Sequence, residues 1–388
     1  MREVFATFLR LGSTSFGGPV AHLAYFRRTL VEERKWLDAA AFARIVAFCS
    51  VLPGPTSSQV GMLIGFTRAG PIGAAAAWLG FTAPSAIGMV LVAAALGGAE
   101  RHSPPPWFDG LLTGLFAAAA AVVAQAVIAL AASLCTDLAT KAIGIIAMAI
   151  ALSLRAHPSL QWVAIAFGAI AGALALRHAA LRGEPLPIRV PRTVSVAAGA
   201  LFVALVAFAI VPHGMTGRFL ATLIRAGALV FGGGHVVLPL LQSMIHDGLI
   251  GASNFFAGYG AVQAMPGPLN TFASFLGYAN LSPLHGIAGA LASTVLIFLP
   301  SFALIFAIAP AWNRIVAVPA AAAAVRGANA SVVGLLAAVL YDPVLLSLGG
   351  DWRRIALAMC AFAALALARV APWVVVVGAA AIGALVRA

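Results

Sequence analysis

The sequence predicts an all-α polytopic membrane protein built from two inverted-topology repeats with broken or re-entrant half-helices. Composition is the first reason, because 62% of the 388 residues are hydrophobic and only 9% are charged, whereas a soluble domain carries about 25% charged residues. The second reason is that the apolar runs starting at Ile72 and Gly286 each exceed the ~20 residues needed to cross the hydrocarbon layer. The third reason is an internal repeat covering nearly the whole chain.

The repeat is visible in motifs that recur in the same order. The stretch "FLRLGSTSFGG" at 8–18 matches "LIRAGALVFGG" at 223–233, and "PGP" at 53–55 returns at 266–268. Further along, "APS" starting at Ala83 matches "LPS" starting at Leu299. Because order and spacing both hold, chance is a poor explanation, and the chain is predicted to contain two copies of one unit.

The repeat divides the chain into three predicted parts. Residues 1–176 form the first transporter repeat, and residues 216–388 form the second. Between them, residues 177–215 combine a basic linker, predicted to be cytoplasmic, with one unpaired transmembrane helix at 194–211. A single unpaired crossing inverts the second repeat if each repeat crosses an even number of times, an arrangement common in secondary transporters.

Loop charges also indicate inversion. The loop after the first apolar segment carries Arg27, Arg28, Arg34 and Lys35, whereas its counterpart at 241–254 carries no lysine or arginine. Because basic loops stay in the cytoplasm, the first loop is predicted to be cytoplasmic and the second is not. The net charge of +12 is therefore interpreted mainly as a topology signal.

Five apolar segments separate the two cytoplasmic loops: 39–66, 72–98, 109–135, 142–154 and 158–176. Because both loops are predicted to lie in the cytoplasm, the chain must cross the membrane an even number of times between the two loops. One of the five segments should therefore not span. Segment 39–66 is predicted to be a re-entrant hairpin that turns at "PGP", and the segment broken at 16–19 must then re-enter as well. A rival count, in which every segment spans, also inverts the halves but places 177–192 outside.

Proline and glycine interrupt the helices at two matched places. The predicted helix breaks are Pro53, Gly54 and Pro55 in the first half and Pro266, Gly267 and Pro268 in the second. A helix that restarts after such a break presents unpaired N–H groups and a positive dipole end, which favours an anion. The restarting residues are Thr56, Ser57, Ser58 and Gln59, and then Leu269, Asn270 and Thr271. The alternative is a kink with polar caps.

A second pair of breaks is rich in glycine. Its candidate site residues are Gly17, Gly18 and His22 in the first half and Gly232, Gly233 and His235 in the second. The glycines would let backbone approach a ligand, and the alternative is close packing of helices through small residues. Each histidine is a candidate ligand for the substrate or, alternatively, a structural donor. Neither belongs to a cluster, so no metal site is predicted.

Arg10 and Arg225 occupy equivalent positions within apolar segments. An ionisable residue at membrane depth is a functional candidate by default, and the alternative is that the side chain reaches back to the interface. Every carboxylate lies in a loop or near a segment end, which favours an anion over a cation as the transported species.

Several classes of function are not supported by the sequence. It carries no H-E-x-x-H motif, nucleophile elbow or P-loop, so neither an enzyme nor an ATP-driven pump is predicted. No cofactor is predicted either. Nucleic-acid binding would need a basic face on a soluble module, and none is apparent.

The motifs resemble the chromate ion transporter (CHR) family in its two-domain bacterial form. They are "FGGP" at 16–19, "LPGP" at 52–55 followed by Gln59, "FGGGHVVLP" at 231–239, "QAMPGPL" from Gln263 and "IFLPSF" at 297–302. The resemblance covers the full chain. It implies an inner-membrane protein that exports chromate, is coupled to an ion gradient and confers chromate resistance, with sulfate competing as a similar dianion. One departure is that 245–251 lacks the tryptophan found at Trp36.

The combined prediction is a multi-pass secondary transporter of the cell inner membrane that exports chromate. The dianion would bind where the inverted repeats meet, with half-helix starts supplying donors and Arg10 and Arg225 supplying charge. A sulfate or other oxyanion carrier, an anion channel and a non-transporting membrane scaffold are the alternatives. The predicted partners are the anion and membrane lipid. The coupling ion, the direction of transport and the choice between monomer and homodimer are left open.

Overall fold

The structure is a computed structural model in which every described element is helical. It describes residues 1–101, 106–154, 162–176, 186, 188–211, 214–230, 237–241, 243–312, 314, 318–348 and 351–387. The first half contains α1 (Arg2–Thr14), α2 (Gly18–Phe26), the π-helix η1 (Arg27–Glu33), α3 (Ala39–Val51), α4 (Thr56–Arg101), α5 (Pro106–Leu134), α6 (Leu138–Ser153) and α7 (Trp162–Ala175). The predicted unpaired crossing at 194–211 is α8 (Arg192–Ile210).

The second half begins after α8 and contains α9 (Met215–Leu229), α10 (Val237–Leu241), α11 (Ser243–His246), α12 (Ala252–Gln263), the 3-10 helix η4 (Leu269–Thr271), α13 (Phe272–Ala279) and α14 (Gly286–Ile308). It ends with η5 (Ala309–Ala311), α16 (Pro319–Val339), η6 (Leu340–Leu345), α17 (Leu346–Leu348), α18 (Trp352–Ala366) and α19 (Pro372–Arg387).

Five described helices are long and apolar enough to cross a membrane, judged by length and composition. They span Thr56–Gly97, Trp107–Leu134, Arg192–Ile210, Gly286–Ala311 and Pro319–Asp342. Shorter apolar helices accompany them at Ala39–Val51, Leu138–Ser153, Val163–Ala175 and Pro372–Leu385. The prediction of an all-α polytopic membrane protein is confirmed, and the protein is an integral membrane protein. The inversion of the second repeat stays a prediction.

Helix α4 consists of two arms joined by a sharp turn. Ala69 and Gly70 leave the helical conformation, with φ values of −149° and 60°, and they separate a first arm at 56–68 from a second arm at 71–101. Gly65 of the first arm lies against the backbone of Gly73 in the second, so the arms pack as an antiparallel hairpin. At 1.5 Å per residue the first arm is only ~20 Å long, which is short of the ~30 Å hydrocarbon core.

A matching hairpin lies in the second half. Helices α13 and α14 are joined by a loop at 280–285, and Gly277 lies against the backbone of Gly289. This loop is longer than the turn in α4, and Asn280 organises it through three hydrogen bonds. Its Nδ2 donates to the carbonyls of Gly277 at 2.7 Å and Leu284 at 3.0 Å, and its Oδ1 accepts from the Ser282 N–H at 2.8 Å.

The turns of the two hairpins lie at opposite ends of the second arm of α4. Beside the start of this arm, Arg68 at the end of the first arm is 3.9 Å from the carboxylate of Glu3, and its guanidinium lies over the ring of Trp36. At the other end, Gly97 lines a pocket together with residues of the 280–285 loop. The two equivalent hairpins therefore point in opposite directions along α4.

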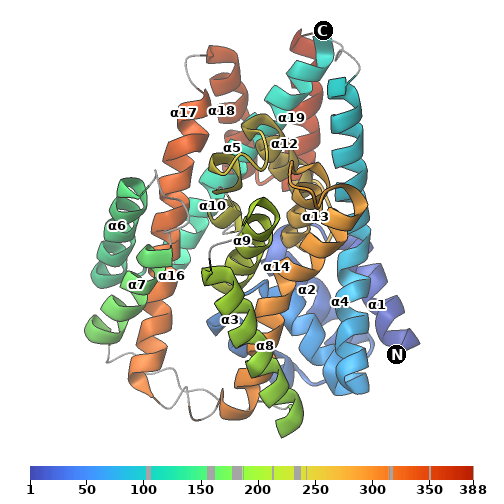
Figure 1. Cartoon of the computed structure of the whole chain (residues 1–388), viewed down its shortest axis with the longest axis vertical. Coiled ribbons are helices and arrows are strands. Elements are labelled where there is room, and N and C mark those ends of the chain that lie inside the picture. The colour runs from blue at the N-terminus through green and yellow to red at the C-terminus, as the bar shows by residue number, and fades with distance from the viewer. Residues whose placement is uncertain are drawn as a thin grey trace.

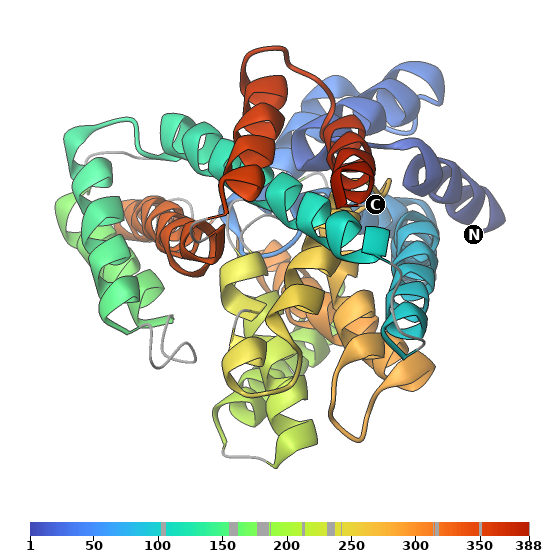
Figure 2. The ribbon, with the colours of Figure 1, turned by 90° about the horizontal axis from the view of Figure 1, so that it is seen from above.

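The remaining helices pack around these hairpins through small residues. Figures 1 and 2 show α6, α7 and α16 on one side of the molecule and α1 and α4 on the other, with α5 between them. Gly168 and Gly172 of α7 lie against the backbone of Gly327 in α16. An ion pair between Arg326 and Asp137, 2.9 Å long, also joins the two halves. Close contacts of this kind are typical of helix packing in membranes.

Candidate functional site

The helices are interrupted at both "PGP" motifs. Helix α3 ends at Val51 and α4 starts at Thr56, while α12 ends at Gln263 and η4 starts at Leu269. The central glycine of each motif adopts a left-handed backbone, with φ of 137° at Gly54 and 90° at Gly267. Residues with a side chain rarely adopt such angles, so glycine allows each chain reversal.

Each break is bonded to the opposite half of the chain. The Gly54 N–H donates to the carbonyl of Val230, which follows α9, at 2.5 Å, and the Gly267 N–H donates to the carbonyl of Ser15, which follows α1, at 2.9 Å. Val230 and Ser15 are equivalent positions in the repeat. Each break therefore donates a backbone hydrogen bond to the equivalent position of the other half, and the two bonds are reciprocal.

Side-chain packing follows the same reciprocal pattern. A Cβ atom added at Gly54 would collide with Ser301 of α14, and one added at Gly267 would lie 3.0 Å from Oγ of Ser85 in α4. Ser85 and Ser301 stand at equivalent positions in the "APS" and "LPS" motifs. Gly12 of α1 also lies against the carbonyl of Phe81, so α1, the second arm of α4 and the second break meet at one place.

The first helix start lies beside a buried histidine. His22 of α2 is only 1% exposed, and its Nδ1 is 3.2 Å from Oγ of Ser57. The backbone of Ser15 also faces the imidazole ring, and the ring stands edge-on against Phe81 with centroids 5.2 Å apart. In the described part of the chain, Nε2 of His22 has no hydrogen-bond partner of ordinary geometry, and the same holds for the Ser15 and Ser58 hydroxyls.

The second helix start carries amide groups instead. Asn270 is 1% exposed, and neither Oδ1 nor Nδ2 of its side chain has a hydrogen-bond partner among the described residues. Thr271 is bonded locally, because its hydroxyl donates to the Pro268 carbonyl at 2.8 Å. Gln263 hydrogen-bonds with the side chain of Tyr259, while its Nε2 is buried without a partner in the described chain.

Gln59 connects the first helix start to its own break. Its Nε2 donates to the Pro53 carbonyl at 2.8 Å, which leaves Oε1 buried without a partner among the described residues. Buried polar atoms in native proteins are nearly always hydrogen-bonded. Several unpaired atoms gathered around two helix starts therefore point to a polar ligand or water at this place.

The buried part of this region is polar and uncharged. Among the described residues, the buried polar side chains are those of serine, threonine, asparagine, glutamine and histidine, with no lysine, arginine, aspartate or glutamate. Most of the unpaired atoms belong to groups that can donate a hydrogen bond. Together with the N–H groups of two helix starts, these donors suit a ligand that presents several oxygen acceptors.

The two candidate arginines lie elsewhere. Arg10 is exposed on α1. Arg225 of α9 is half-buried, and it donates to the Ala209 carbonyl at 3.4 Å and to the Thr222 hydroxyl at 3.1 Å. Ala209 belongs to the last turn of α8, where a cation stabilises the helix dipole. The described hydrogen bonds of Arg225 thus lead to the end of α8, and a role of either arginine in substrate binding stays a prediction.

The glycine-rich breaks are described only in the first half. Gly17 and Gly18 have φ values of 100° and 78°, and they form the turn between α1 and α2. Gly232, Gly233 and His235 of the second half lie outside the described residues.

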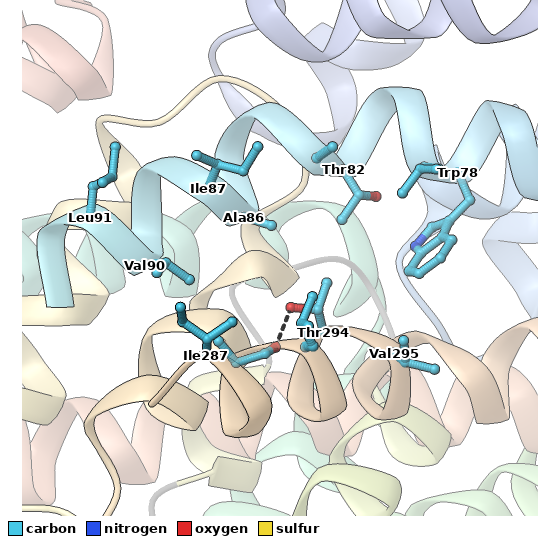
Figure 3. Close-up of a pocket in the computed structure, with 13 residues that line it drawn as sticks. Trp78, Thr82, Ala86, Ile87, Val90, Leu91, Ile287, Thr294 and Val295 are labelled. Carbon is cyan, nitrogen blue, oxygen red and sulfur yellow. Dashed lines mark hydrogen bonds between the residues drawn. The ribbon is translucent and has the colours of Figure 1, made fainter. Parts of the chain in front are cut away.

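Two cavities border the hairpins. A groove of ≈ 490 Å³ lies between the second arm of α4 and α14, and Figure 3 shows that apolar side chains such as Ile87, Leu91 and Ile287 line it. These side chains are exposed at the molecular surface, so the groove suits acyl chains better than an anion. The second cavity, ≈ 410 Å³, is more polar and lies between the end of α4 and the 280–285 loop, with Tyr278 and His285 in its lining.

Some site residues were not predicted from the sequence. Ser15 contributes a carbonyl to Gly267, and Ser85 and Ser301 pack on the two central glycines. The repeat contained a signal for two of them, because "APS" and "LPS" recur at matched positions. Tyr259, which hydrogen-bonds with Gln263, had no comparable signal in the sequence, because no repeated motif marks it or its partner.

Comparison with known proteins shows which family the chain resembles. A family model described as "Chromate transporter" matches residues 2–173 and again residues 217–384. The chromate transport protein of Pseudomonas aeruginosa is 30% identical over 356 residues, which cover 88% of this chain and 80% of that protein. The chromate transport protein of Cupriavidus metallidurans is 26% identical over 346 residues, covering 87% and 80%.

An uncharacterized transporter of Methanocaldococcus jannaschii is 27% identical over 325 residues, which cover 81% of this chain and 77% of that protein. No solved structure matches. The named relatives are transporters and not enzymes, as the sequence predicted. With the family model covering both halves, the resemblance seen in the motifs is confirmed, and the chain belongs to the chromate transporter family.

Proposed function

We propose that this protein exports chromate across the cell inner membrane as a secondary transporter driven by an ion gradient, and that the dianion binds between the two breaks. The observation that carries the proposal is the reciprocal bonding of Gly54 to Val230 and of Gly267 to Ser15. It joins two helix starts from opposite halves next to buried polar atoms without partners. Membership in the family supports chromate as the substrate.

The chemistry of the region fits a tetrahedral oxyanion. Chromate presents four oxygen atoms that accept hydrogen bonds, and the region offers the donors of Ser58, Asn270, Gln263 and His22 together with helix N–H groups. Removing an oxyanion from water requires that its lost hydrogen bonds be replaced. Sulfate has the same charge and nearly the same shape, so we expect it to compete.

The opposed hairpins support an inverted arrangement of the two repeats. Their turns lie at opposite ends of the second arm of α4, one beside Arg68 and the other beside the 280–285 loop. In inverted-repeat transporters the site lies where the repeats meet, and each side opens in turn. The apolar groove between α4 and α14 then faces membrane lipid.

Transport of labelled anion by everted membrane vesicles tests the proposal. We expect vesicles that contain this protein to take up radiolabelled chromate with saturation, and unlabelled sulfate to compete. Uptake should change when an ion gradient or membrane potential is imposed. The test variant is Asn270→Ala, which removes an unpaired amide at the second helix start without adding volume and should weaken chromate uptake. Absence of chromate uptake in the unmodified protein would overturn the proposal, and uptake that never saturates would favour a channel.

A further inference from the structure

We propose that His22 takes up one proton when the oxyanion binds, so that the proton and the anion cross the membrane together. The inference rests on the proposed function, because it places the anion at the breaks. The proton comes from water on the side where the anion enters and returns to water on the side where it leaves, so no other reactant is needed.

The geometry around His22 is the first support. Its imidazole is almost fully buried and interacts with the Ser15 backbone, and Nδ1 has a hydrogen-bond partner, the hydroxyl of Ser57 at the start of α4. Nε2 has none of ordinary geometry in the described chain. The large majority of buried side-chain nitrogens in proteins have a hydrogen-bond partner. An unpaired ring nitrogen in a polar region is available for a ligand.

The position of His22 ties it to both breaks. Ser57 belongs to the first helix start, while the backbone of Ser15 faces the ring. The carbonyl of Ser15 also accepts the hydrogen bond from Gly267 in the second break. An anion held between the two helix starts would therefore lie next to the imidazole.

No described charge competes for this position. The titratable and charged groups with described side chains on α2 and on the elements packed against it are Arg2, Glu3 and Arg10 on α1, Tyr25 on α2, Arg27, Arg28, Glu32 and Glu33 on η1, and Arg68 on α4. All of them are exposed. Several are paired at the surface, since Arg27 lies 3.5 Å from Glu32 and Arg28 lies 2.9 Å from Glu33. The ring itself contacts Ser57, the Ser15 backbone and Phe81, none of which carries a charge.

The electrostatics then favour different states with and without the anion. An unpaired cation is costly to bury, so the empty site holds a neutral imidazole. An opposite charge within a few ångströms favours the charged form of such a group, by about ten- to a thousand-fold. A dianion at the breaks supplies that charge, and the proton in turn halves the net charge that must be buried.

The two binding events are reciprocal. If the anion increases the affinity of His22 for a proton, protonation must increase the affinity for the anion by the same factor. Anion affinity therefore rises as the pH falls. Because each dianion then crosses with one proton, a single net negative charge moves outward per anion. A membrane potential that is negative inside drives this net charge outward, so the potential, and not a proton gradient, is the driving force for export.

Sulfate binding to the purified full-length protein tests the linkage. Sulfate is the suitable probe because it remains a dianion from about pH 5.5 to about pH 8.5, a range that brackets the usual titration of histidine, whereas chromate itself takes up a proton near neutral pH. Titration calorimetry in buffers with different ionisation enthalpies counts the protons taken up. We expect close to one proton per sulfate, and affinity that rises up to about tenfold per unit fall in pH.

Two variants make the test specific. His22→Gln keeps a donor of similar size but cannot titrate, so we expect sulfate binding without proton uptake or pH dependence. His285→Gln changes an exposed histidine that is bonded to the Ser282 carbonyl, and it should keep the behaviour of the unmodified protein. Thermal unfolding checks that His22→Gln is folded; if it is not, His22→Asn replaces it, and the proton count on the unmodified protein still decides.

The outcomes separate the two proposals. If sulfate binds with the same affinity at every pH and no proton is taken up, the linkage is wrong while the proposed function stands. A pH dependence that persists in a folded His22 variant also overturns the linkage, because another group then takes the proton. If neither sulfate nor chromate binds or is transported, the proposed function fails, and this inference fails with it.

Discussion

At the first break the helix restarts with Ser57 beside His22, whereas at the second it restarts with Asn270, whose amide has no partner among the described residues. The position aligned with His22 in the second half is Val237, a buried apolar residue. Yet both breaks have the same backbone, with a left-handed glycine that donates its N–H to the opposite half. The comparison teaches that the two breaks share one backbone geometry while the side chains around it differ.

The largest effect is expected from giving the central glycines a side chain. In Gly54→Ala, the new Cβ would meet Ser301 and the Gln59 side chain, and the left-handed backbone alone costs about 1–2 kcal/mol. We expect loss of nearly all transport and a large fall in thermal stability. Gly267→Ala should do slightly less harm, because its nearest neighbour is Oγ of Ser85 at 3.0 Å. Flux assays and unfolding in detergent measure both effects.

Gly286→Ala is the matched control for the central glycines. Gly286 also has a positive φ, 64°, but an added Cβ would meet nothing within 4 Å. We expect a stability loss of about 1 kcal/mol from backbone strain alone and nearly normal transport. Equal losses in all three variants would show that strain, and not the contact between halves, is what matters at the breaks.

Two asparagines of the second half separate binding from stability. Asn270→Ala removes an amide with both polar atoms unpaired, so we expect anion affinity to fall about tenfold or more while thermal stability is kept or improved. Asn280→Ala removes three formed hydrogen bonds in the 280–285 loop. It should lower stability by on the order of 2 kcal/mol with little change in affinity. Calorimetry measures the affinity and thermal unfolding measures the stability of the same samples. A loss of stability in Asn270→Ala together with a loss of affinity in Asn280→Ala would contradict the prediction.

A peripheral contact between the halves is expected to matter less than the central one. Asp137 caps α6 in a capping box with Thr140, and its carboxylate pairs with Arg326 of α16. Asp137→Ala should cost about 1 kcal/mol and leave transport intact. A larger loss of transport than in Gly54→Ala would reverse the ranking of the two contacts.

The pH dependence of this cap has a definite sign. The Thr140 backbone N–H, with a smaller contribution from the Arg326 guanidinium, holds the pKa of Asp137 below its usual range. A lowered pKa in the folded state means that the stabilisation is complete above the ordinary range of aspartate and is lost as the pH falls through the lowered value. The difference in unfolding free energy between the unmodified protein and Asp137→Asn should therefore shrink as the pH is lowered through the acid range.

The smallest effect is expected in the charged cluster beside the turn of α4, where Trp36 has no tryptophan counterpart in the second half. Arg34 and Arg68 both approach the carboxylate of Glu3, at 3.0 and 3.9 Å, and both lie over Trp36. Because all these charges are exposed, Arg68→Ala should change stability by less than about 1 kcal/mol. The change should shrink further at high salt. An effect on stability that salt does not alter would contradict this assignment.

Much of the helical framework could be predicted from residues alone. Gly70 followed by Pro71 separates two apolar segments, and the structure places the turn of α4 at this point. The positions of the "PGP" interruptions also follow from the conformational limits of proline and glycine. Such signals are local, because a residue's own backbone preferences determine where its helix ends.

Contacts between distant residues could not be predicted in this way. Nothing in the composition near Ser15 indicates that its carbonyl accepts a bond from Gly267. Arg225 shows the same difficulty, because hydropathy marks it as a buried charge but does not reveal that the end of α8 lies beside it. The reciprocal bonding of the breaks emerges only when the two halves are folded together.

That reciprocal bonding has a consequence for how the protein is made. The N–H of Gly54 has no carbonyl to accept it until Val230 has left the ribosome and entered the membrane, some 176 residues later. Throughout this interval the newly made first half carries a backbone donor without its final acceptor, and such unpaired polar groups are unfavourable wherever water is excluded. The first break therefore takes its final form only after the second half has been made, so the first half alone does not satisfy its own backbone.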